Sequence, residues 1–176
     1  MLRKFKRMCS FLFGSNDRDI EGRRLIYKMR KLYIKGGRIN YARSRRVANK
    51  LRLRYGCTFW PEMELGKDVY VAHMHNILIG RTASIGDRCK IYPGVYIVSS
   101  LKEEVPSSGV LRRHAIVGSD CILGAGCIVV GAVEIGDDVT IGAGAIVTKN
   151  IPAHSIVINT NQIISKANQS SGGMES

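Results

Sequence analysis

Aliphatic residues recur at every sixth position through most of the chain after residue 64. They are Leu65 and Val71, then Ile79, Ile85, Ile91 and Ile97 after two extra residues, and finally Val117, Leu123, Val129, Ile135, Ile141 and Val147. Glycine directly follows seven of them, at Gly66, Gly80, Gly86, Gly118, Gly124, Gly136 and Gly142. A helix would place such residues on drifting faces, because six is not a multiple of its turn of about 3.6 residues. Very short strands that meet at turns fit this period, with one side chain pointing inward and glycine easing the turn.

A second set of small or apolar side chains follows the repeat starts by four positions. It consists of Val69, Ala83, Cys89, Val95, Cys121, Cys127, Val133, Val139, Ala145 and Ile151. Two inward positions per repeat predict a mainly β repeat fold. Three of the five cysteines belong to this set. We therefore expect buried thiols in a reducing compartment, with no disulfide framework and no zinc site.

The chain before Cys57 has a helical pattern instead. Apolar spacing predicts one helix from Asp19 to Ile34, ended by Gly36–Gly37, and another from an Asn40 cap to Gly56. The expected buried stripes are Leu25, Met29 and Leu32 on the first helix, and Ala48, Leu51 and Tyr55 on the second.

Charge divides the chain at the same place. Residues 1–56 carry 18 Lys and Arg against 3 acids, a balance of +15, whereas the other 120 residues carry 9 against 11. We therefore expect a basic helical region at 1–56, a β domain at 57–164 and a disordered tail at 165–176. Residues 1–13 form a basic amphipathic segment, for which contact with a membrane interface and docking on the protein's own oligomer both remain open. No nucleic-acid recognition motif supports a nucleic-acid partner.

No run of apolar residues approaches the ~20 needed to span a bilayer. The basic start has too short an apolar stretch for a secretory signal. We therefore expect a cytoplasmic protein, peripheral at the inner face of the membrane if the N-terminal segment binds lipid.

Two histidines lie where the six-residue repeat is interrupted. His73 precedes Ile79 at the first interruption, and His114 follows the polar insertion at 98–113. Irregular segments that project from a regular scaffold are the usual places for functional groups. His75 and His154 are interpreted as structural, and a zinc site of the β-helical carbonic anhydrase kind is disfavoured because His73 and His75 lie two apart on a broken coil.

The motifs around these histidines resemble the serine acetyltransferase branch of the hexapeptide-repeat acyltransferase superfamily. The match covers residues 57–158, with Tyr70-Val71-Ala72-His73 as the first histidine motif and Arg113-His114 as the second. The resemblance implies a left-handed parallel β-helix with three hexapeptides per coil, so that residues 18 apart stack. It also implies a homotrimer with active sites between subunits, acetyl-CoA as the acyl donor and no metal.

Site residues follow from the same resemblance. His73 would be the general base, His114 a second essential histidine, and Arg113 the group that steadies the acceptor's charge. The pantetheine arm of coenzyme A would meet backbone groups at Gly124-Ala125 and Gly142-Ala143, and its phosphates would face Lys149.

Several positions depart from the family's pattern. The aspartate before the first histidine, which contacts the serine amine, is Ala72, and the aspartate that orients the histidine is Thr58, with Glu62 or Glu64 as candidate replacements. On these grounds we expect the acceptor to be a small-molecule or lipid-linked saccharide of surface polysaccharide biosynthesis. Serine O-acetylation for cysteine synthesis and a non-catalytic trimeric scaffold are the alternatives.

Overall fold

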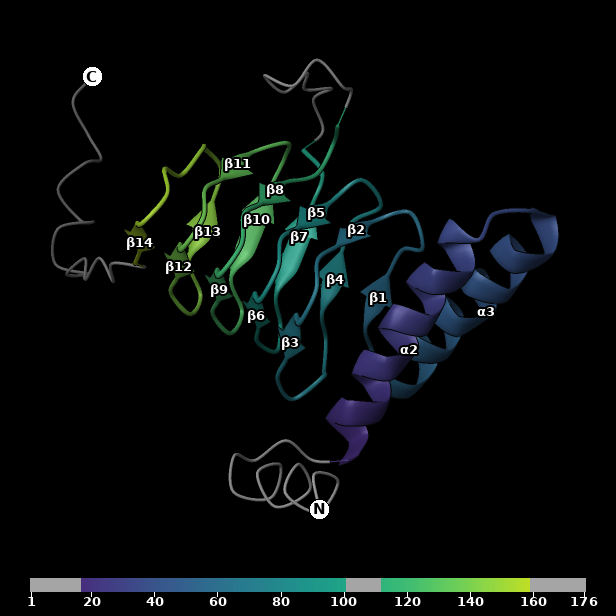
Figure 1. Ribbon diagram of the computed structural model, residues 1–176. Coiled ribbons are helices and arrows are strands. Elements are labelled where there is room, and N and C mark those ends of the chain that lie inside the picture. Colours follow the sequence, from purple (N-terminus) through teal and green to yellow (C-terminus); the bar gives the residue numbers. More distant parts are fainter. Residues whose placement is uncertain (1–16, 101–111, 159–176) are drawn as a thin grey trace, which may run out of the picture.

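The computed structural model describes residues 17–100 and 112–158. A pair of antiparallel helices lies at one end of a prism built from short parallel strands (Figure 1). The prism is the expected left-handed parallel β-helix, and the fold is mainly β as predicted.

The strands fall into three parallel sheets, which we call A, B and C. Sheet A contains β1 (Thr58–Phe59), β4 (Leu78–Ile79), β7 (Tyr96–Val98), β10 (Ile128–Val130) and β13 (Ile146–Val147). Sheet B contains β2 (Glu64–Leu65), β5 (Ser84–Ile85), β8 (Ile116–Val117) and β11 (Glu134–Ile135). Sheet C contains β3 (Tyr70–Val71), β6 (Lys90–Ile91), β9 (Ile122–Leu123), β12 (Thr140–Ile141) and β14 (Ile156–Val157). Consecutive strands therefore visit the sheets in the order A, B, C.

The six-residue period gives each strand one inward side chain. The aliphatic repeat starts are buried, apart from the partly buried Leu65, and they form the core of the prism. Residues 18 apart pair as expected, since Val117 is in register with Ile135 and Leu123 with Ile141. The second inward set is buried too, including Cys89, Cys121 and Cys127, with Ile151 partly buried at the end.

The two helices are α2 (Asp17–Ile34) and α3 (Arg38–Tyr55). The core takes in Ile26 and Met29 of α2 and Leu51 and Tyr55 of α3. The predicted Asn40 cap is wrong, because α3 begins earlier with Gly37 as its N-cap and no side-chain cap bond. Gly37 adopts φ 83° there, a conformation that glycine accepts without steric cost.

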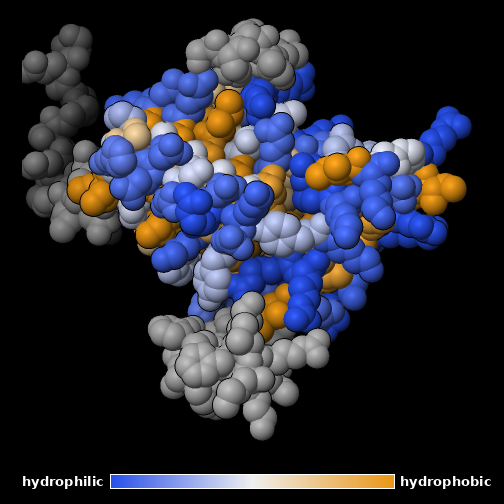
Figure 2. Space-filling model, viewed as in Figure 1, coloured by the Kyte–Doolittle hydropathy of each residue, from blue (hydrophilic) through white to orange (hydrophobic). Residues whose placement is uncertain are grey.

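Hydrophilic side chains cover most of the face in Figure 2, with hydrophobic patches between them. One patch lies at the tip of the helical pair, where Ile34 and Ile39 are each 71% exposed. Neither α2 nor α3 has the length and apolar character needed to cross a membrane. The amphipathic segment 1–13 with its expected membrane contact, Cys9 and the tail 165–176 lie outside the described residues, and so does most of the insertion before His114.

Candidate active site

The candidate residues lie on two edges of the prism, both bordering sheet A. We call the edge where the chain passes from sheet C to sheet A the C–A edge. His73 lies there, between β3 and β4, and it is an exposed residue. Ala125 lies on the same edge between β9 and β10, and Ala143 between β12 and β13. The candidate base and the candidate pantetheine positions therefore follow one edge along the prism.

The remaining candidates lie on the edge where the chain passes from sheet A to sheet B, the A–B edge. Arg113 and His114 directly precede β8, and Lys149 follows β13 before Ile151 bridges to Ile135 of β11. Sheet A separates this edge from His73. Within one chain, the residues of each half of the predicted site share one edge. The two halves themselves lie on different edges.

Glycines let the coils approach closely at the coenzyme positions. A Cβ atom on Gly124 would lie 2.7 Å from the backbone nitrogen of Ala143. The backbone amide of Gly124 donates a hydrogen bond to the carbonyl of Ile141, and the backbone amide of Gly142 donates one to the carbonyl of Val157. Ala125 and Ala143 are exposed beside them, which leaves a narrow, small-residue strip along the C–A edge.

His114 is packed against the preceding coil. Its Nδ1 atom lies 2.8 Å from the hydroxyl of Thr82, and its ring lies directly over Gly80. Burial lowers the pKa of His114 below its ordinary value, and the positive charge of Arg113 lowers it further. The imidazole is therefore neutral at physiological pH and has one nitrogen that accepts and one that donates.

Gly80→Ala is expected to displace the His114 ring, because the added Cβ would lie 1.8 Å from its Cδ2 atom. Overpacking of this kind costs about 1–3 kcal/mol of the free energy of unfolding. The measurement is the Tm of Gly80→Ala against wild type, repeated in a His114→Ala background. Without the imidazole ring, Gly80→Ala should lower the Tm much less. An equal fall in Tm in both backgrounds would contradict the contact between Gly80 and His114.

His73 has a partner that the sequence did not reveal. The carboxylate of Asp19, in the first turn of α2, accepts hydrogen bonds from the backbone amides of His73 (3.0 Å) and Met74 (2.8 Å). Asp19 is 3% exposed, and its Oδ2 atom lies 3.9 Å from Nδ1 of His73. His73 adopts φ 42°, in the left-handed region that few non-glycine residues occupy.

The candidate replacements for the family's orienting aspartate have other partners. Glu62 accepts a hydrogen bond from the hydroxyl of Tyr41, and Glu64 forms an ion pair with Arg112 at 3.5 Å. Nothing local in the sequence pointed to Asp19, which lies 54 positions before His73.

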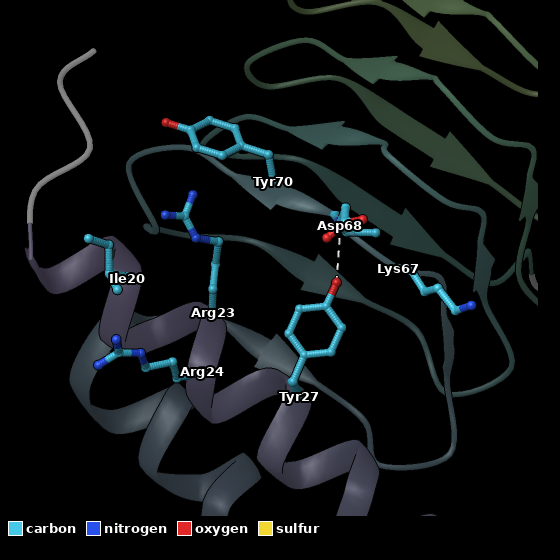
Figure 3. A pocket seen from close by; sticks show the side chains of 8 residues that line it. Ile20, Arg23, Arg24, Tyr27, Lys67, Asp68 and Tyr70 are labelled. Carbon is cyan, nitrogen blue, oxygen red and sulfur yellow. Dashed lines mark hydrogen bonds between the residues drawn. The ribbon is translucent and has the colours of Figure 1, made fainter. Parts of the chain in front are cut away.

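Two surface hollows lie near these elements. A hollow of about 350 Å³ on sheet A is lined by Thr58, Leu78 and Tyr96, together with Asn76 of the C–A edge. A larger one, of about 690 Å³, lies between α2 and the turn that joins sheet B to sheet C (Figure 3). Neither histidine lines the larger hollow, so we place the site by the histidines rather than by cavity size.

Residues 114–149 match the family model described as bacterial transferase hexapeptide (six repeats). A serine acetyltransferase of Mycobacterium tuberculosis is 34% identical over 133 residues, which are 74% of this chain and 55% of that protein. A serine acetyltransferase of Synechococcus elongatus is 34% identical over 114 residues, covering 65% and 44%. The crystal structure of serine acetyltransferase isoform 3 from Entamoeba histolytica, in complex with cysteine, superposes with a TM-score of 0.68 at 26% identity and covers 88% of this chain and 53% of that one.

The chain thus spans about half the length of the curated relatives it matches. Their names contradict the expected saccharide acceptor, because relatives and structural neighbours alike are serine acetyltransferases. That prediction relied on single positions such as Ala72 and did not foresee that another element supplies a carboxylate beside His73. The fold, the matched repeats and these relatives together show that the chain belongs to the hexapeptide-repeat acyltransferase superfamily, on its serine acetyltransferase-like branch.

Proposed function

We propose that this protein transfers the acetyl group of acetyl-CoA to the hydroxyl of serine. His73 takes the hydroxyl proton as the oxygen attacks the thioester carbonyl. The new carbon–oxygen bond forms, the carbon–sulfur bond breaks, and the protonated His73 returns its proton to the departing thiolate. The products are O-acetylserine and free coenzyme A, with no covalent acyl-enzyme.

The observation that carries this proposal is the alignment of His73, Ala125 and Ala143 along one edge of the prism. A pantetheine arm is long and thin, and a strip of small residues lets it lie against the backbone. With the pantetheine arm along the C–A edge, the thioester would lie at the end of that edge that carries His73. Serine as the acceptor rests on the serine acetyltransferases that this chain resembles.

The complete site is proposed to form between copies in a homotrimer. The C–A edge of one copy would meet the A–B edge of the next, since each carries residues that the other lacks. Arg113 and His114 of the neighbouring copy would then face the acceptor, with Arg113 opposite its carboxylate. Lys149 of that copy would face the coenzyme phosphates.

The outer face of sheet A is suited to such an assembly. Its outward side chains are mostly apolar: Leu78, Tyr96, Val98, Ile128, Val130 and Ile146. Ile146 is 64% exposed in the single chain. A contiguous apolar face of this kind is typical of an interface, because its side chains leave water on association.

The direct test of the function is release of the coenzyme A thiol from acetyl-CoA in the presence of L-serine. We expect saturable thiol release that depends on L-serine, with O-acetylserine as the acetylated product. D-serine and a nucleotide sugar serve as matched acceptor controls. Thiol release with the nucleotide sugar but not with L-serine would overturn the proposal, and no release with any acceptor would favour a non-catalytic scaffold.

A further inference from the structure

The turn that carries His73 is held by a carboxylate from a different element. The two oxygens of Asp19 each accept one hydrogen bond, from the amides of His73 and Met74. Two successive amides directed at one anion form the kind of backbone nest that binds negative charge. This contact explains how His73 keeps its left-handed φ of 42°.

Helix α2 is fixed over the same coil at two further points, so Asp19 does not reach the turn on a loose element. The hydroxyl of Tyr27 accepts a hydrogen bond from the amide of Val69 and donates one to the carbonyl of Gly66. The guanidinium of Arg23 lies 4.6 Å from the ring centroid of Tyr70. Figure 3 shows both side chains extending from α2 toward the strand that leads to His73.

The position of the carboxylate also suits the chemistry. A histidine that acts as a base becomes positively charged, and a nearby buried carboxylate stabilises that charge and restrains the ring. Oδ2 of Asp19 lies 3.9 Å from Nδ1 of His73. A carboxylate on the Nδ1 side of the ring would leave Nε2 to take the proton of the acceptor hydroxyl. The family's orienting position is Thr58 here, and its hydroxyl carries no charge.

We propose that Asp19 is the positioning residue for His73, a role that α2 supplies in this chain in place of the β-helix. The proposal rests on the proposed function only in taking His73 as the base. It makes the N-terminal helical region part of the catalytic apparatus rather than an appendage.

The experiment compares Asp19→Asn with Glu21→Gln in the full chain. An asparagine at position 19 keeps one oxygen that can accept a hydrogen bond from the turn. Its side-chain NH2 group would face the second backbone N–H, and the negative charge is lost. Glu21 lies on the same helix and pairs with Arg54 and Lys50 on the exposed side, so it is the matched control. We expect Asp19→Asn to lower kcat for serine by about 10–100-fold, a smaller loss than that of a carboxylate hydrogen-bonded directly to the imidazole, because Oδ2 lies 3.9 Å from Nδ1. The KM for acetyl-CoA should stay within about twofold, because the coenzyme strip is untouched, and Glu21→Gln should match wild type.

The same substitution is then made in a His73→Ala background. A residue that acts through His73 has almost no further effect once the ring is gone. An equal fall in kcat with and without His73, or an unchanged kcat in Asp19→Asn, would overturn the positioning role.

Amide hydrogen exchange gives a readout that does not depend on the reaction. The amides of His73 and Met74 should exchange at least about tenfold faster in Asp19→Asn than in wild type and in Glu21→Gln. If wild-type protein fails to acetylate serine, the proposed function fails, and the exchange rates alone then decide on Asp19. Unchanged protection of both amides would refute the anchoring contact.

Discussion

His73→Ala is expected to lower kcat for serine acetylation by about 10²–10⁴-fold, the usual contribution of a general base. The KM for acetyl-CoA and the Tm should change little. The side chain of His73 is 69% exposed, and its backbone contact with Asp19 does not need the imidazole. Steady-state thiol release with L-serine and a thermal melt measure both effects.

His75→Ala is the matched control for this prediction. His75 is exposed in the same turn, and its carbonyl, which an alanine retains, accepts the amide of Gly94. We expect it to keep nearly full activity. A fully active His73→Ala protein would leave the proposed base untenable, and equal losses in both variants would point to the turn rather than to the ring.

Two inactive variants are expected to restore activity when they assemble together. His73→Ala lacks the base on its C–A edge, and His114→Ala lacks the imidazole on its A–B edge. A mixed trimer holds two copies of one variant and one of the other, so about one of its three interfaces joins the C–A edge of a His114→Ala copy to the A–B edge of a His73→Ala copy. About a third of the sites in trimers that carry both variants are therefore intact when each site is shared across a heterologous interface.

The measurement is kcat of protein co-expressed from both genes and purified through two different tags. Each variant alone sets the baseline, and sedimentation gives the oligomeric state. If each site lay within a single chain, mixing the variants would restore no activity. A mixed assembly whose kcat equals that of the single variants would therefore contradict the shared site. Ile128→Glu on the outer face of sheet A should abolish recovery by preventing assembly, since it buries a charge in an apolar interface.

The six-residue spacing by itself determined the core of this protein. Period and side-chain type alone decide which positions of each repeat face inward, so the burial of Ile97, Val117 and Cys121 was predicted correctly. The two interruptions of the period likewise marked His73 and His114. The start of α3 was missed because Gly37, rather than the side chain of Asn40, ends the turn before the helix.

Only the tertiary structure decided how the candidates are distributed. The sequence grouped His73 with His114, but the order of the three sheets places them on different edges, with sheet A between them. Asp19 was also beyond reach of the sequence, because its partner is a backbone turn 54 positions away and a backbone amide carries no residue-specific signal. A local period records the direction of a side chain, whereas the winding of the coil and the docking of α2 decide which distant groups meet.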